Sequence, residues 1–163
     1  MEIRLATLDD LDIIMQIFDE ARLFMRQQGN MEQWSNGYPQ RELMQKDILN
    51  QNCYVCVLDG QTIGVFCYFT DPDPTYSVIV DGAWPNDEPY GVIHRIATTC
   101  HRKGVANACY DFALSKRPTL RVDTHRDNIP MQRSLTKFGF QYCGTIFLAD
   151  GSPRIAFQIT RSA

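Results

Sequence analysis

The sequence lacks both an excess of positive charge and any long apolar run. Its 163 residues carry 16 Lys and Arg against 19 Asp and Glu, which gives a formal net charge of −3. Because proteins that bind nucleic acid usually present a basic surface to the phosphates, we predict no nucleic-acid partner. No apolar run approaches the roughly 18 residues that span a bilayer, so the sequence also predicts no membrane association.

The first ten residues, MEIRLATLDD, lack the apolar core of a secretory signal, which favours a cytoplasmic location. Internal repeats and linker-like segments are missing as well. A chain of this length favours one domain, residues 1–163, around a single core. With 44% hydrophobic and 21% charged residues, the composition is that of a globular protein rather than a disordered one.

Two nucleotide-binding motifs are absent, the GxGxxG of a dinucleotide site and the GxxxxGK(S/T) of a P-loop. Six cysteines are present, and Cys53 and Cys56 form a CxxC sequence within a strand pattern. Side chains three positions apart on a strand point to opposite faces, which makes a poor chelate or disulfide. We therefore predict buried thiols in a reducing compartment and no metal site, with a zinc or redox site as the less favoured alternative.

Hydrophobic periodicity divides the chain into short strands and helices. A first helix is expected from Thr7, with Asp10 completing a variant capping box, because apolar residues then recur at helical spacing. Further helices are expected from Pro39 to about Gln51, from Gly104 to about Lys116, and from Asn128 to Gly139. The expected strands cover residues 2–6, 53–58, 62–70, 90–99, 120–124, 140–148 and 154–159, with a shorter one near 77–80.

The order of these elements combines hairpins with strand–helix–strand units in the second half of the chain. It predicts an α/β fold, a mixed β-sheet flanked by helices on both faces. The segment from Asp71 to Pro89 is long and contains four prolines and five carboxylates. Irregular segments of this length in a compact domain are often functional.

The turn from His101 to Ala106, HRKGVA, places two cations and a glycine at the start of a helix. The first amides of a helix lack internal partners and carry the positive end of the helix dipole. Gly104 has no Cβ, so an oxygen can approach the backbone closely, while Arg102 and Lys103 add positive charge. The turn therefore suits a pyrophosphate. Many such turns bind nothing, so a generic anion-binding α/β domain stays an alternative.

In their order along the chain, these residues resemble the GNAT superfamily of N-acetyltransferases. The matching order is the strand YGVIHRIATT, the turn HRKGVA, a helix, the strand LRVDT, and the segment from Asn128 to Phe140. The family's turn signature, Gln/Arg-x-x-Gly-x-Gly/Ala, fits Gly104 and Ala106. Its later signature, Asn-x-x-Ala, a helix and a Gly-Phe pair, fits Asn128 and the pair Gly139-Phe140. The resemblance covers essentially the whole chain.

The resemblance implies an acyl-CoA N-acyltransferase fold, with a β-sheet splayed at its centre between the strands ending near Thr99 and Thr124. It implies acetyl-CoA (coenzyme A) as the cofactor, because splayed strands free peptide groups that an amide-bearing ligand satisfies. Pantetheine amides would pair with Ile96, Ala97 and Thr98, and Asn128 would approach the same arm. Backbone amides of Arg102, Lys103, Gly104, Val105 and Ala106 would hold the pyrophosphate. Gly104→Val is then expected to abolish cofactor affinity and leave the fold largely intact.

The sequence departs from the family at two positions. The Gln/Arg position of the turn falls on His101. The tyrosine that usually protonates the leaving thiolate, four residues before the glycine of the Gly-Phe pair, is replaced by Leu135. Ser134 or a bound water is the substitute that we consider for this general acid.

Acetyl transfer to an amine needs a base, a polarised thioester carbonyl, and placement of the reactants. His94 lies in the strand before the turn, near where family members often place a glutamate base. His125 ends the neighbouring strand and is the second catalytic candidate, since histidine titrates in the required range. Each histidine also has a structural alternative. His94 could have its hydrogen bonds satisfied within the sheet, and His125 could make a hydrogen bond to a loop. Arg95 should face the other side of its strand and is interpreted as structural.

The acceptor site is expected from the first two helices and the long loop, with five aromatic candidates: Phe24, Trp34, Tyr38, Trp84 and Tyr90. Trp34 and Trp84 lie in irregular segments, where binding roles are common, whereas core packing also accounts for Phe24. The carboxylates of the long loop either attract a cationic amine or form a solvated surface.

These observations predict an N-acetyltransferase that moves an acetyl group from acetyl-CoA to a primary amine, with a small-molecule acceptor favoured over a protein. An acyl-CoA-binding regulatory module with little turnover is the alternative, motivated by Leu135. Because homodimers are common among such folds, a homodimer is a possible oligomeric state of this chain.

Overall fold

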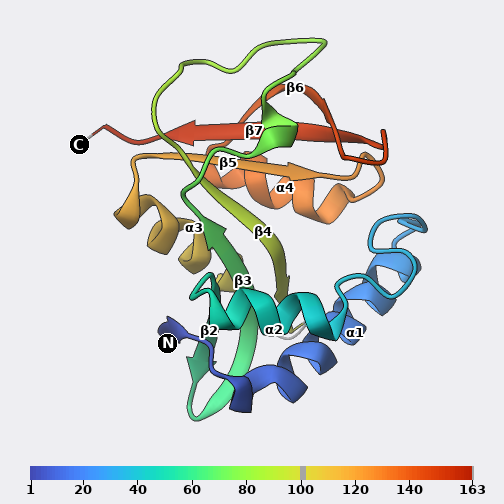
Figure 1. The fold of residues 1–163 in the computed structure, drawn as a ribbon, viewed down its shortest axis with the longest axis vertical. Helices are drawn as coiled ribbons and strands as arrows, with labels where there is room; N and C mark the ends of the chain where they lie inside the picture. Colours follow the sequence, from blue (N-terminus) through green and yellow to red (C-terminus); the bar gives the residue numbers. More distant parts are fainter. Residues whose placement is uncertain (100–101, 163) are drawn as a thin grey trace.

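The computed structural model describes residues 1–99 and 102–162. Seven strands form its sheet: β1 (Glu2–Leu5), β2 (Cys53–Leu58), β3 (Gln61–Phe69), β4 (Gly91–Thr98), β5 (Thr119–Thr124), β6 (Gln141–Phe147) and β7 (Pro153–Thr160). Four α-helices accompany them: α1 (Leu11–Gln27), α2 (Arg41–Leu49), α3 (Val105–Lys116) and α4 (Ile129–Phe138). Two 3-10 turns, η1 (Leu8–Asp10) and η2 (Pro74–Tyr76), complete the chain (Figure 1).

The strands lie in the order β1-β2-β3-β4-β5-β7-β6. Every neighbouring pair is antiparallel except β4 and β5, which are parallel because α3 connects them as a crossover. The predicted mixed α/β sheet is therefore confirmed. None of the described helices has both the length and the apolar character needed to cross a bilayer.

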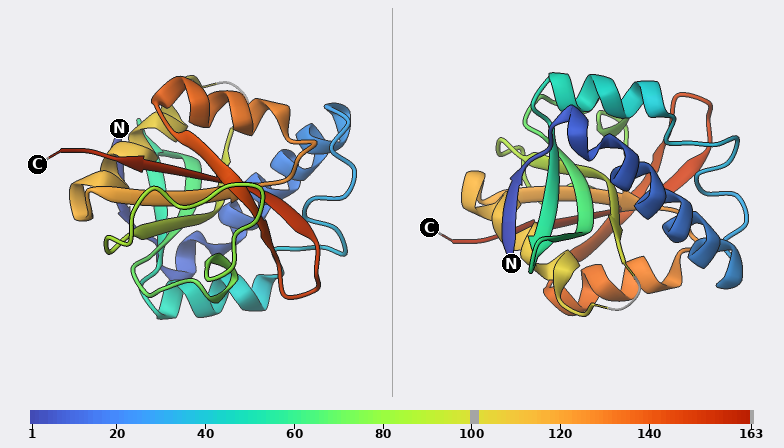
Figure 2. Two further views of the ribbon diagram at one scale, coloured as in Figure 1. Left: turned by 90° about the horizontal axis from the view of Figure 1, so that it is seen from above. Right: turned by 90° about the horizontal axis from the view of Figure 1, so that it is seen from below.

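Helices cover both faces of the sheet (Figure 2). α1 and α2 enclose one apolar cluster against β2 and β3, α3 and α4 enclose a second, and a smaller third one lies around Tyr76 of the β3–β4 loop. Cys53 belongs to the first cluster and Cys56 to the second, so the CxxC thiols point to opposite faces, as strand geometry predicts. The Cys56 Sγ instead lies 3.5 Å from the Sγ of Cys109.

The predicted capping box forms, but it caps the 3-10 turn η1, and α1 itself begins four residues after Thr7, at Leu11. The Asp10 carboxylate accepts a hydrogen bond from the backbone N–H of Thr7 at 2.8 Å, which completes the predicted capping box. The same carboxylate accepts two hydrogen bonds from Arg4, at 2.8 and 2.9 Å. The guanidinium of Arg4 lowers the pKa of Asp10, so the ion pair that anchors β1 to α1 persists in mild acid.

The long loop between β3 and β4 is ordered without the predicted strand near residues 77–80. It forms η2 instead, and Val80 makes a single bridge to Thr145 in β6. The loop is held by Arg121 of β5, whose guanidinium carbon lies 4.0 Å from the centre of the Trp84 ring and 4.1 Å from that of Tyr90. This anchoring replaces strand pairing and fixes the loop against the sheet.

Candidate active site

The central feature of the molecule is the separation of β4 from β5. Within the described residues, the two strands pair only at the first two positions of β4, Gly91 and Val92. Beyond this point β4 stays bonded to β3 as far as Thr98, and β5 stays bonded to β7 as far as Thr124. Figure 1 shows the two strands diverging from their common start. The predicted central splay is confirmed, and it leaves facing strand edges whose peptide groups need other partners.

A cavity of about 630 Å³ occupies this gap. Its wall is contributed by the end of α1 and the loop after it, the β3–β4 loop, β4, β5, the start of α4 and the β6–β7 turn. Its lining includes Glu32, Gln33, Trp34, Tyr38, Asp73, Ile93, His94, Arg95, Ile96, Val122, Asp123, Thr124, Asn128, Met131 and Arg154. The cavity thus draws together segments from both halves of the chain.

The cavity is lined from both faces of the sheet. Ile93, Ile96 and Val122 belong to the apolar cluster that contains α3 and α4. His94 lies on the opposite face, where its ring centre is 5.8 Å from that of Phe69 and 6.2 Å from that of Tyr76. Two ligands that enter from opposite faces can therefore meet between the separated strands.

A β-bulge in β4 changes the direction of Arg95. Between the pairs that Ala97 and His94 make with β3, β4 advances by one residue more than its partner. Arg95 sits at this extra position with a φ of 54°, and its guanidinium lies 5.5 Å from the centre of the Phe69 ring, on the His94 face. The prediction that Arg95 faces the other side is wrong, because the bulge interrupts the alternation of a regular strand.

Arg95 forms a buried ion pair at the wall of the cavity. Its Nη2 lies 2.8 Å from Oδ2 of Asp47, and its Nη1 donates a hydrogen bond to the Tyr38 hydroxyl at 3.0 Å. Burial opposes the charged guanidinium, but the Cys67, Tyr38 and Asp47 side chains outweigh it and raise the pKa of Arg95. The guanidinium therefore stays charged and holds Tyr38 in place.

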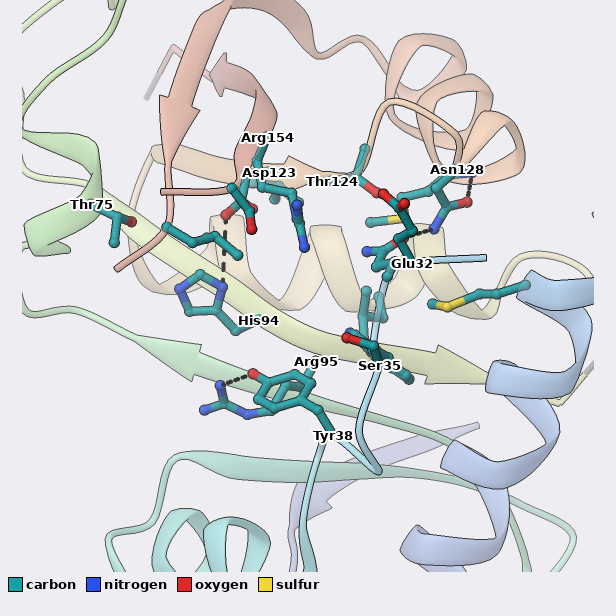
Figure 3. A pocket seen from close by; sticks show the side chains of 18 of the residues that line it. Glu32, Ser35, Tyr38, Thr75, His94, Arg95, Asp123, Thr124, Asn128 and Arg154 are labelled. Atoms are coloured by element: carbon teal, nitrogen blue, oxygen red, sulfur yellow. Dashed lines mark hydrogen bonds and ion pairs between the residues drawn. The ribbon is translucent and has the colours of Figure 1, made fainter. Parts of the chain in front are cut away.

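His94 lies between two carboxylates, of which Asp123 is labelled in Figure 3. Its Nε2 is 2.7 Å from Oδ2 of Asp73, and its Nδ1 is 3.9 Å from Oδ1 of Asp123. Burial raises the pKa of Asp73, but hydrogen bonds from His94 and Thr75 outweigh burial and lower that pKa to about 2. An ionised Asp73 favours the His94 tautomer that carries its proton on Nε2, which leaves the lone pair of Nδ1 free to accept a proton.

The second histidine candidate lies apart from this cavity. His125 is buried beside Glu32 and Arg126 at a smaller pocket, and it is not among the described residues that line the cavity of His94. Its Nδ1 accepts a hydrogen bond from the backbone N–H of Asp127 at 3.0 Å, which matches the structural alternative. Burial lowers the pKa of His125, with Arg154 adding to the shift.

The five aromatic candidates separate into two groups. Trp34 and Tyr38 line the cavity and contact each other, with ring centres 6.4 Å apart. Phe24, Trp84 and Tyr90 are not among the described lining residues. Phe24 is 37% exposed on α1, and the other two enclose Arg121, so cation–π packing accounts for them.

The predicted anion turn has an open backbone at the start of α3. Gly104 is the N-cap with a φ of 84°, and a Cβ built there meets no atom of residues 1–99 or 102–162 within 4 Å. Arg102 and Lys103 are exposed beside it, Val105 is buried and Ala106 is half-buried. Cys100 and His101 lie outside the described residues.

The other cofactor candidates occupy the two sides of the gap. Ile96 lines the cavity, whereas Ala97 and Thr98 pair with β3 and are not among its described lining residues. Asn128 lines the cavity, but its Oδ1 caps α4 by accepting from the N–H of Met131 at 3.1 Å. Its Nδ2 donates to Oε1 of Gln33 at 2.9 Å, so both ends of the amide are already engaged.

Among the cavity-wall residues that the sequence did not indicate, two carry polar groups that face the gap. Asp123 faces His94, and Thr124 has a buried hydroxyl without a hydrogen-bond partner among the described residues. A carboxylate at the carboxyl end of a parallel strand is a signal that could have indicated Asp123, since ligands of α/β sheets bind there. Nothing local in the sequence distinguishes Thr124.

Solved structures with related folds identify the family. A GNAT-family acetyltransferase from Streptococcus agalactiae 2603 is 34% identical over 99% of this chain and 96% of its own, with a TM-score of 0.91. A putative acetyltransferase from Staphylococcus aureus Mu50 is 26% identical over 98% and 99%, with a TM-score of 0.71. No protein-family model matches the chain. No curated protein matches it either. On the strength of the first relative, this chain is an enzyme that belongs to the GNAT family of acetyltransferases.

Proposed function

We propose that this acetyltransferase uses acetyl-CoA as its donor and acetylates a primary amine of a small molecule by direct attack on the thioester. The observation that supports this most is the cavity between β4 and β5, which is lined by free strand edges and by His94. GNAT acetyltransferases in general use acetyl-CoA. The proposal therefore concerns which residues of this chain hold the donor and which prepare the acceptor.

The donor side fits an amide-bearing diphosphate ligand. Ile96 offers its strand edge, and the hydroxyl of Thr124 is a buried polar atom that lacks a partner among the described residues. The open backbone at Gly104 and the exposed Arg102 and Lys103 suit the diphosphate. Bound acetyl-CoA would supply a thioester whose C–S bond is exchanged for the new C–N bond, while its sulfur takes a proton.

The acceptor side needs a proton acceptor, because an ammonium ion has no lone pair with which to attack. Nδ1 of His94 faces the cavity and is free when Nε2 donates to Asp73. The ammonium gives one proton to Nδ1, and the imidazolium later releases it to solvent. The ionised Asp73 orients the ring and stabilises its cationic form. His125 is not among the described residues that line this cavity, which supports His94 as the base.

The size of the cavity supports a small-molecule acceptor. Its volume of about 630 Å³ is typical of small-molecule pockets, and Trp34 and Tyr38 from the loop after α1 line it. A protein acceptor is the alternative within this reaction class. A ribosomal-protein-alanine N-acetyltransferase from Brucella melitensis shares the fold at 16% identity and a TM-score of 0.65. A cytoplasmic location, the lack of nucleic-acid and membrane partners, and a homodimer remain proposals from the sequence.

A coenzyme A release assay over a panel of primary amines tests the proposal, with acetyl-CoA binding measured separately by calorimetry. We expect binding of acetyl-CoA and turnover of at least one amine. Binding without turnover on any amine would favour the regulatory module. The reason to consider this module is Leu135, which is buried and replaces the family's usual general acid. No binding of acetyl-CoA would leave only a generic anion-binding domain.

The variant His94→Gln separates binding from chemistry. Glutamine can still bond Asp73 but cannot accept the proton of the ammonium. We expect kcat/KM to fall by about 10²- to 10⁴-fold, the usual contribution of a general base. The affinity for acetyl-CoA should stay unchanged. His125→Gln serves as the matched comparison, and a larger loss of kcat/KM there would transfer the base role to His125.

A further inference from the structure

Asp123 is a carboxylate in the cavity wall that the proposed proton transfer does not use. Its side chain is only 10% exposed. Its Oδ1 accepts a hydrogen bond from the Tyr76 hydroxyl at 2.6 Å. Among the described residues, none donates a hydrogen bond to its other oxygen, Oδ2. Because so little of this carboxylate is exposed to water, a cation or a hydrogen-bond donor that reaches Oδ2 is favoured there.

Tyr76 fixes the orientation of this carboxylate. The residue is 2% exposed, and its backbone carbonyl accepts a hydrogen bond from Nε1 of Trp84 at 2.9 Å. Burial raises the pKa of Tyr76 well above its ordinary value, and the charge of Asp123 adds to the shift. The hydroxyl therefore keeps its proton and donates it to Oδ1, which leaves Oδ2 for a ligand.

The distance between Asp123 and His94 leaves room for a bridging group. Oδ1 of Asp123 lies 3.9 Å from Nδ1 of His94, which is too far for a direct hydrogen bond. Figure 3 shows the two side chains pointing toward each other from the two separated strands. A group placed between the two side chains would meet a proton acceptor, Nδ1, on one side and a negative charge, the carboxylate, on the other. A primary ammonium has enough N–H groups to satisfy both.

We infer that Asp123, oriented by Tyr76, binds the ammonium group of the acceptor and directs one of its N–H bonds at Nδ1 of His94. This inference rests on the proposed function, and it names the form in which the acceptor binds, as a primary ammonium cation. The enzyme should therefore favour amines that are protonated at neutral pH over neutral nucleophiles of similar size, such as alcohols. Quaternary ammonium ions lack the N–H groups and should bind poorly.

The proton balance at this site closes. The ammonium nitrogen loses one proton to Nδ1 of His94, and its freed lone pair forms the C–N bond as the C–S bond breaks. The nitrogen loses a second proton to the leaving sulfur. The products are the amide, the thiol and one proton, which the imidazolium of His94 returns to solvent. Asp123 keeps its covalent bonds and its charge throughout these reaction steps.

The variant Asp123→Asn tests the inference, because it removes the charge and keeps the shape and the acceptor for Tyr76. We expect KM for the amine to rise by about 10- to 100-fold, the value of a lost charge-assisted hydrogen bond. The affinity for acetyl-CoA and the thermal midpoint should change little. Asp59→Asn, on the exposed β2–β3 turn, removes the same charge far from the cavity and should leave KM unchanged. An unchanged KM in Asp123→Asn would overturn the inference while the proposed function stands.

Tyr76 is a positioning residue, and Tyr76→Phe tests it through coupling. The loss of the hydroxyl should raise KM for the amine less than Asp123→Asn does. In the double variant the two effects should not add, because both act through one carboxylate. Fully additive effects, as a merely structural role would give, would contradict the assignment of Tyr76.

A binding measurement decides the inference even if no amine in the panel is turned over. The imidazole ¹⁵N signals of His94 can be followed while n-butylammonium is added, with tetramethylammonium as the cation without N–H groups. We expect n-butylammonium alone to shift the Nδ1 signal, and Asp123→Asn to abolish the shift. No shift in the unchanged protein, or an equal shift with both cations, would exclude the ammonium site independently of turnover.

Discussion

At the scale of single residues, the bond between Asp73 and His94 decides how the histidine is used. A carboxylate that stays ionised holds the Nε2–H tautomer and turns the lone pair of Nδ1 toward the cavity. The sequence indicated His94 as a candidate base because of its place before the turn. It did not indicate the partner, since Asp73 lies 21 positions away in an irregular loop and only the folded chain brings the two together.

The lowered pKa of Asp73 predicts an acid-dependent part of the stability. The native carboxyl has a pKa of about 2 against 3.8 for the ordinary group. The unfolded chain therefore takes up the proton first as the pH falls, so stability is present above about pH 4 and is lost toward pH 2. We expect about 2 kcal/mol of the free energy of unfolding to disappear over this range.

Denaturant unfolding between pH 6 and 2.5 measures this effect. The slope that belongs to Asp73 should be missing in Asp73→Asn, which is less stable at pH 6 and converges with the unchanged protein in acid. Asp71→Asn, at an exposed neighbouring position, is the matched control and should keep the slope. Parallel curves for Asp73→Asn and the unchanged protein would contradict the lowered pKa.

At the scale of elements, the start of α3 requires glycine at position 104 for two separate reasons. The sequence indicated close approach of a ligand to Gly104. The structure adds a φ of 84°, a left-handed conformation that costs an ordinary residue about 1–2 kcal/mol. Gly104→Val is therefore expected to lose stability as well as affinity, and the expectation of an intact fold needs this correction.

Two variants separate these reasons. Asparagine tolerates the left-handed region better than alanine. Gly104→Asn should therefore retain more of the thermal stability than Gly104→Ala, while its larger side chain covers the open backbone. We expect the affinity for acetyl-CoA to fall more in Gly104→Asn, as measured by calorimetry. If affinity follows thermal stability in both variants, close approach at this turn is not required.

The bulge in β4 is the element that the sequence did not indicate. One extra residue at Arg95 brings two consecutive side chains, His94 and Arg95, to the same face of the sheet. The first then reaches Asp73, and the second reaches Asp47 and Tyr38. A strand read by simple alternation cannot predict this, because the register depends on pairing with β3.

At the scale of the whole molecule, the splay predicts where a bound donor would protect the backbone. Hydrogen exchange should slow at residues 93–96 and 102–106 when acetyl-CoA is added, because the first segment has no partner on the side of β4 that faces β5 and the second forms the start of α3. Residues 53–58 of β2, which pair with β1 and β3 and are not among the described residues that line the cavity, should exchange equally with and without the ligand. Uniform protection along the chain, or none in the first two segments, would contradict the proposed donor site.

The sequence by itself determined the order of the main strands and helices, the bounds of α3 and α4 to within a residue, and the turn at Gly104, because these depend on residues close together in the chain. Through its resemblance to a family, it also indicated the splay and the donor side of the cavity. Only the tertiary structure decided the acceptor side, where Asp123 meets Tyr76 from 47 positions away and faces His94 across the gap. The physical reason is that a carboxylate becomes a binding group through burial and through the partners on neighbouring elements. Those partners are set by packing, which no local pattern records.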